Sequence, residues 1–158
     1  DAMYHVTVLD TPDNRQRPVL FMRLGELDLS KLKKVGVTVK VVMRRHVREL
    51  ERMQKAVEAS PVREAGHLFV QDVSNCSLRK GLLAWPLWME VARVGQAYYP
   101  ELLGCLCALA GHQGPIAHWV VNRMRVHVDP VTAQKIHVHM GAPNAGLNPF
   151  GLSSDLLQ

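Results

Sequence analysis

Two different periods of hydrophobic and polar residues run along this chain of 158 residues, and each predicts a kind of element. Between Val39 and Ala59 the apolar residues recur every three or four positions, with charged residues between them. This spacing is typical of an amphipathic helix that packs one face and exposes the other. The same spacing predicts helices from Leu82 to Tyr99 and from Ile116 to Val128, a short one around Leu29 to Val35, and one further turn from Pro130.

Short apolar runs, bounded by turn-forming residues, lie between the helical stretches and predict strands. They cover residues 4–9, 18–23, 67–73, 104–110 and 136–140. A turn signal at Thr11 to Asn14 separates the first two runs, so we expect these to form a β-hairpin. The later runs alternate with helices, which favours parallel pairing. The sequence therefore predicts an α/β domain with a largely parallel sheet over residues 1–140 and an irregular tail over residues 141–158.

The composition fits one globular domain, since 47% of the residues are hydrophobic and 21% are charged. Apolar stretches are interrupted well before the ~20 residues that a membrane span needs. The segment Asp1 to Tyr4 shows neither the basic nor the apolar region of a secretory signal. Cys76, Cys105 and Cys107 form no CxxC pair and are expected to be reduced thiols. We therefore expect a soluble, cytoplasmic protein.

Positive charge gathers in one part of the chain. The net charge is +5, and between residues 31 and 55 nine lysines and arginines face only two glutamates, nine minus two leaving +7. Such a stretch could attract an anionic membrane surface or nucleic acid, and it could equally be the solvated face of a helix. It carries no signature of a nucleic-acid-binding module, so nucleic acid is not expected as a partner.

Metal and catalytic chemistry have weak support in the sequence. His137 and His139 share one face of an expected strand, with His127 and Asp129 nearby in sequence. No further ligand lies at a spacing that forces convergence, so no metal is expected. The sequence also contains no nucleophile elbow and no glycine motif for nucleotides. We assign no catalytic residue and expect no enzyme activity.

Two short motifs carry most of the functional information. The motif Tyr98-Tyr99-Pro100-Glu101 precedes one expected strand, and the segment Asp129 to Lys135, with the sequence Asp-Pro-Val-Thr-Ala-Gln-Lys, precedes another. Weaker matches are Arg17-Pro18-Val19, Leu24-Gly25 and Gln71-Asp72-Val73. In this order and on these elements, the motifs resemble the CRAL-TRIO lipid-binding domain of the Sec-fourteen-type lipid transfer proteins. The resemblance extends from roughly Tyr4 to Met140, most of the chain.

The resemblance implies a sheet that forms the floor of an apolar pocket, helices around it, and a mobile gating helix over it, here Pro115 to Val128. The family's N-terminal helical subdomain is expected to be absent. The domain would hold a single phospholipid, with phosphatidylinositol as the favoured ligand, and would need no cofactor. It would be a monomer that associates transiently with anionic membranes as a peripheral protein.

The resemblance also implies roles for individual residues. Glu101, Thr132 and Lys135 would hold the headgroup, because lysine and a threonine hydroxyl can meet a phosphodiester while glutamate accepts hydrogen bonds from ring hydroxyls. Without the family context they would be a helix-capping threonine and a surface ion pair. The pocket and gate residues would be Phe69, Tyr98, Leu106, Ile116, Trp119, Val120 and Met124. His67 and Phe69 replace small hydroxyl residues of phosphatidylcholine binders, which argues against phosphatidylcholine as the ligand.

Two alternatives stay open at the level of the sequence. The chain could be a protein-interaction or membrane-docking regulatory domain that keeps the fold without a competent pocket, with its basic helix on the partner. It could also bind another small hydrophobe, of the sterol, retinoid or tocopherol type. The apolar spacing of the gate would result equally from ordinary core packing.

Overall fold

The computed structural model describes residues 5–112 and 114–157, without the side chains of Ile116, Ala117, Met124, Ser154 and Leu157, and within these residues five strands form one sheet. The strands lie in chain order: β1 (Val6–Val8), β2 (Val19–Arg23), β3 (His67–Asp72), β4 (Leu103–Gly111) and β5 (Ile136–Met140). β1 pairs antiparallel with β2, and the later neighbours pair in parallel. The predicted α/β class, with its hairpin and largely parallel sheet, is confirmed.

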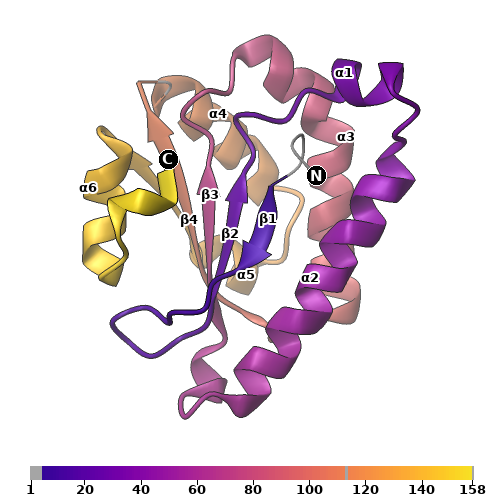
Figure 1. Ribbon diagram of the computed structural model, residues 1–158. Coiled ribbons are helices and arrows are strands. Elements are labelled where there is room, and N and C mark those ends of the chain that lie inside the picture. The colour runs from indigo at the N-terminus through magenta and orange to yellow at the C-terminus, as the bar shows by residue number, and fades with distance from the viewer. Residues whose placement is uncertain (1–4, 113, 158) are drawn as a thin grey trace.

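Helices cover both faces of the sheet (Figure 1). They are α1 (Leu29–Lys34), α2 (Val39–Ala59), α3 (Leu78–Tyr98), α4 (Gly114–Arg125), α5 (Pro130–Gln134) and α6 (Pro143–Leu147), with short 3-10 helices at Arg63–Ala65, Asn148–Phe150 and Ser154–Leu157. The long helices α2 and α3 cover one face together with α4, whereas α6 covers the other face.

Side chains of the central strands alternate between these two layers. On β2, Leu20 and Met22 are buried in the core under α2 and α3, whereas Val19 and Phe21 are buried in the core under α6. Successive residues of a strand point to opposite faces, and a parallel sheet is usually covered on both. This explains why the strands have nearly continuous apolar runs.

Two helices differ in length from the prediction. α3 begins at Leu78 and not at Leu82, because Ser77 caps it: the Ser77 Oγ accepts a hydrogen bond from the Lys80 N–H at 3.3 Å. α4 ends at Arg125, three residues before the predicted end at Val128. The bounds of α2 and β5 agree with the sequence analysis.

The segment after residue 141 is expected to be irregular, whereas the structure contains α6 and 3-10 turns there. Pro143 starts α6, where a missing N–H is tolerated. Leu147 and Leu152 are buried against β2, β3 and β4. These residues therefore close the second core.

No helix in the described part of the chain combines the length and the apolar character that crossing a membrane requires.

Candidate functional site

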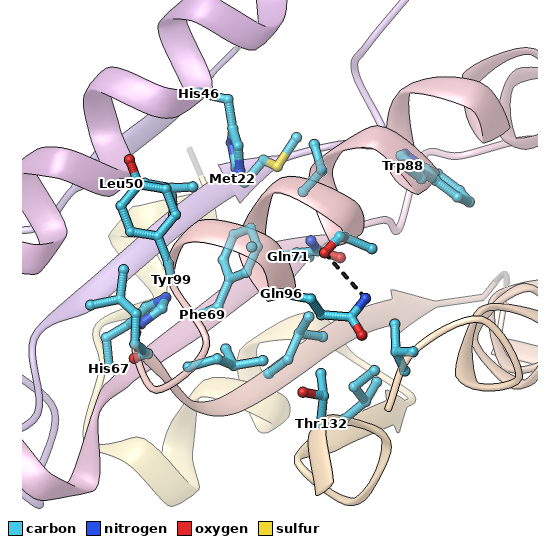
Figure 2. A pocket seen from close by; sticks show the side chains of 18 of the residues that line it. Met22, His46, Leu50, His67, Phe69, Gln71, Trp88, Gln96, Tyr99 and Thr132 are labelled. Carbon is cyan, nitrogen blue, oxygen red and sulfur yellow. Dashed lines mark hydrogen bonds between the residues drawn. The ribbon is translucent and has the colours of Figure 1, made fainter. Parts of the chain in front are cut away.

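A cavity of about 110 Å³ lies between one face of the sheet and helices α2, α3 and α5 (Figure 2). Most of its wall is apolar, with Met22, Leu50, Phe69, Val91, Leu106 and Ile136 among the lining residues. The polar side chains at the wall belong to His46, His67, Gln71, Gln96, Tyr99 and Thr132. A mainly apolar space with a few placed polar groups is typical of sites for small apolar ligands.

Small residues on α3 leave room above the sheet. Ala92 and Gly95 line the cavity one turn apart, and a Cβ added to Gly95 would meet no atom within 4 Å. One turn earlier, Trp88 packs into the core. The Gln96 side chain does not fill the gap, because its Nε2 donates to the Ala92 carbonyl of its own helix at 3.3 Å (Figure 2).

His67, the first residue of β3, is a deeply buried polar group at this site, with 2% of its surface exposed. Its Nδ1 lies 2.5 Å from the carbonyl oxygen of Leu102. A carbonyl can only accept, so Nδ1 carries the proton and Nε2 keeps a lone pair. The His67 Nε2 is buried and has no hydrogen-bond partner in the part of the chain that the structure describes. Burial lowers the pKa of His67 to about 4, so the ring is neutral.

A second buried histidine, His46 on α2, lies on the other side of Phe69. The ring centroid of Phe69 is 6.4 Å from that of His46 and 6.1 Å from that of His67. Burial, with the charge of His67 as a smaller cause, lowers the pKa of His46 to about 4. The three neighbouring rings, tilted by 35–36° from one to the next, form a neutral aromatic wall at neutral pH.

Two glycines place His67 against the neighbouring strand. Gly66 has a φ of +63°, and a Cβ on it would lie 2.7 Å from the Leu102 carbonyl oxygen. Gly104 is the extra residue of a bulge, since His67 pairs with Leu103 and Leu68 with Cys105. A Cβ on Gly104 would lie 1.9 Å from the carbonyl oxygen of Ala65. The strands can therefore approach here only because both residues lack a side chain.

Of the three expected headgroup residues, Thr132 lines the cavity from α5, whereas Lys135 and Glu101 are not among its lining residues. Lys135 is half-buried, and its Nζ donates to the carbonyl oxygen of Leu103 at 2.6 Å. Glu101 is exposed in the turn before Leu103 and does not line the cavity. Asp129 caps α5, and its hydrogen bonds from the Thr132 hydroxyl and amide lower the pKa of Asp129.

The expected pocket and gate residues separate into groups. Phe69 and Leu106 line the cavity. Tyr98 is 69% exposed, and the adjacent Tyr99 lines the cavity in its place, with its hydroxyl donating to Glu51. The side chain of Trp119 is also exposed. The side chains of Ile116 and Met124 lie outside the described residues.

Val120, the remaining gate residue, lines a second cavity of about 30 Å³ between α3 and α4. Leu24, Gln71 and Trp88 line both cavities, so they form the partition between the two. Val121 of α4 also lines the smaller space. α4 is thus a wall of a second space that Leu24, Gln71 and Trp88 separate from the main cavity.

The sequence analysis missed His46, Gln71, Gln96 and Trp88 as lining residues. His46 had a usable signal, since it falls within the apolar stripe of α2 that includes Val42, Met43 and Leu50. Within the described residues, no group of three or more His, Cys, Asp or Glu side chains is arranged to hold a metal ion.

Comparisons with a family model and with individual known proteins point to the same domain family. A family model described as CRAL/TRIO domain matches residues 2–147. A phosphatidylinositol/phosphatidylcholine transfer protein of Arabidopsis thaliana is 32% identical over 134 residues, which cover 80% of this chain and 22% of that protein. A CRAL-TRIO domain-containing protein of Saccharomyces cerevisiae is 30% identical and is matched by 80% of this chain, over 41% of its own length.

A SEC14 cytosolic factor of Yarrowia lipolytica is 27% identical over 86% of this chain and 27% of its own length. The chain therefore spans well under half of these curated relatives. Among solved structures, Sfh5 superimposes with a TM-score of 0.66 at 20% identity, over 88% of this chain and 49% of that protein. That likeness shows a shared fold.

Proposed function

We propose, because this chain belongs to the CRAL/TRIO domain family, that it binds one lipid molecule in the cavity between the sheet and α3. The observation that carries the proposal is an apolar cavity in a chain that has a relative named as a phosphatidylinositol/phosphatidylcholine transfer protein. Each buried CH₂ of an acyl chain contributes about 0.8 kcal/mol, which favours extraction of a lipid by an apolar space. The proposed role is binding, and it requires no covalent step.

The cavity volume implies a closed conformation. Ligand pockets commonly measure roughly 300–1,000 Å³, whereas this cavity measures about 110 Å³. A whole phospholipid therefore needs additional space. The second cavity lies directly behind the partition of Gln71 and Trp88, and α4 contributes Val120 and Val121 to its wall. We take α4 as the gate, because its outward movement would open the smaller cavity and extend the larger one.

Phosphatidylinositol is the ligand that the polar groups favour. The Lys135 ammonium has three N–H donors and uses one on Leu103, which leaves donors for a phosphodiester. The Thr132 hydroxyl donates to Asp129, so its lone pairs can accept from a ring hydroxyl. Glu101 is exposed in the same turn region and can accept from further ring hydroxyls.

Contact with an anionic membrane is supported at the opposite end of the sheet, where the strands end. Exposed lysines of α1 and the start of α2 lie beside exposed Val35 and Val39. α1 contacts α3, whose first turns expose Leu78, Leu82 and Leu83. Basic residues near an anionic surface contribute roughly 1 kcal/mol each, and exposed apolar side chains can enter the interface. This surface borders the smaller cavity, which would place the gate at the membrane.

Native mass spectrometry after exposure to mixed phospholipid vesicles tests the proposal. We expect one phospholipid per chain, identified as phosphatidylinositol after extraction. The double variant Thr132→Ala with Lys135→Ala should retain roughly tenfold less phosphatidylinositol, or still less, than the wild-type protein. The matched control is Thr7→Ala with Lys55→Ala, since these exposed residues do not line the cavity.

Two results would contradict the proposal. A folded protein that carries no lipid but floats with anionic vesicles would indicate a docking domain. If the double variant retains as much phosphatidylinositol as the control variant does, the assignment of Thr132 and Lys135 to the headgroup is refuted. Lipid binding itself would stand.

A further inference from the structure

Buried polar atoms without partners are rare in folded proteins, because an unmade hydrogen bond leaves the full desolvation penalty. The His67 Nε2 is such an atom within the described residues, and its ring belongs to the cavity wall (Figure 2). The other ring nitrogen is occupied by the Leu102 carbonyl. Because the His67 residue lines the cavity, a ligand that enters there can supply the partner of this acceptor.

We propose that His67 Nε2 is a recognition site for a ligand hydroxyl, so that the lipid bound here carries an O–H group near this end of the cavity. The inference rests on the proposed function, since it takes the cavity as the lipid site. It adds a residue and a chemical requirement that the headgroup assignment does not contain.

The tautomer decides the chemistry. A neutral imidazole with its proton on Nδ1 can only accept at Nε2. Phosphatidylcholine has phosphate and ester oxygens and a quaternary ammonium, and therefore no O–H or N–H to donate. Ring hydroxyls of an inositol headgroup can donate, and so can the single hydroxyl of a lipid alcohol. The buried acceptor therefore discriminates between ligands by hydrogen-bond donors.

The location of His67 agrees with this chemistry. His67 pairs with Leu103, whose carbonyl accepts the Lys135 ammonium. The charge of Lys135 also contributes to the low pKa of His67, which reflects their proximity. A headgroup held by Lys135 and Thr132 would bring its hydroxyls to the end of the cavity where His67 lies.

The test uses two matched pairs of probes in native mass spectrometry: phosphatidylinositol against phosphatidylcholine with the same acyl chains, and hexadecanol against its methyl ether. Wild-type protein should retain the hydroxyl-bearing member of at least one pair roughly tenfold better. In His67→Phe, which keeps an aromatic ring without the acceptor, the preference should fall to about one in the hexadecanol pair and should fall severalfold in the phosphatidylinositol pair, where Thr132 and Glu101 still meet ring hydroxyls. His67→Gln, which keeps an acceptor oxygen, should preserve part of it.

His137→Phe is the control, because it makes the same change at an exposed position of β5. A His67-dependent preference in the phosphatidylinositol pair identifies an inositol hydroxyl as the donor. A His67-dependent preference in the hexadecanol pair identifies the hydroxyl of a lipid alcohol as the donor. Equal retention within both pairs by the wild-type protein would overturn the inference and leave the proposed function intact. Retention of none of the four probes would overturn both. A preference that is undiminished in His67→Phe would exclude His67 as the acceptor.

Discussion

Replacing Ala92 by leucine distinguishes a ligand cavity from an ordinary gap in the core. Ala92 lines the cavity from α3, and leucine would place three more carbons into it. A residual cavity destabilises a protein by about 24 cal/mol per Å³. Filling the whole cavity of about 110 Å³ would therefore raise the free energy of unfolding by at most about 2.6 kcal/mol.

The three carbons themselves give a second figure. At about 0.8 kcal/mol for each buried CH₂, less about 0.5–1 kcal/mol for the side-chain rotamers that leucine loses, the net gain is about 1.5 kcal/mol. Leucine is also a good helix former. We expect Ala92→Leu to raise the free energy of unfolding by about 1–2 kcal/mol and to lower lipid retention roughly tenfold or more.

Urea denaturation of the lipid-free protein measures the first effect, and native mass spectrometry of vesicle-exposed protein measures the second. Ala97→Leu is the matched control, because Ala97 is exposed on the same helix. Its stability should change by less than about 0.5 kcal/mol, and its lipid content should not change. A less stable Ala92→Leu protein would refute the cavity argument. A stabilised protein with undiminished lipid would show that the lipid lies elsewhere.

Three further predictions concern the groups that build the cavity. Gly104→Ala should lower the free energy of unfolding by more than about 2 kcal/mol because the new Cβ meets a backbone oxygen, whereas Gly95→Ala should raise it; urea midpoints of both variants test the contrast. The pKa values of His46 and His67 are lowered to about 4 from the ordinary 6.5, so the unfolded chain binds protons first on acidification. Stability should therefore fall between pH 6.5 and pH 4 and stay constant between about pH 7 and pH 8, and an unchanged urea midpoint at pH 5 would contradict this. Burial raises the pKa of the Cys107 thiol to about 11, so iodoacetamide should label it at pH 8 roughly a hundredfold more slowly than an unfolded thiol, as peptide mapping can show.

Local patterns were sufficient to predict most elements of the fold. The apolar stripe of α2 repeats with a helical period over its full length, and the runs at β3 and β5 are short, apolar and bounded by turns. α6 could not be predicted in this way. Its five residues are too few for a period to show, and Leu147 is buried only because it packs against strands that are distant in the sequence. Tertiary packing, and not local preference, makes that segment helical.

The candidate site was less accessible to sequence reasoning. Thr132, Lys135 and Glu101 could be proposed because short motifs contain them, and Phe69 and Leu106 because they lie on apolar strands. The lone pair of His67 depends on the carbonyl of Leu102, thirty-five residues away, and on the close approach of Gly66 and Gly104. No period in the sequence encodes that contact.

Two buried polar atoms in the cavity walls lack hydrogen-bond partners among residues 5–112 and 114–157, and ligand binding or opening of the cavity would give them partners. The Nε1 of Trp88, in the partition between the two cavities, is buried without a partner in the described residues, as is the Nε2 of His67. Each such atom costs the closed state about 1–3 kcal/mol. A ligand hydroxyl would satisfy the acceptor of His67. Movement of α4 away from Trp88 would expose the indole donor to water or to an ester oxygen. Both unpaired atoms therefore lower the free-energy difference between the closed, empty conformation and an open, lipid-bound one.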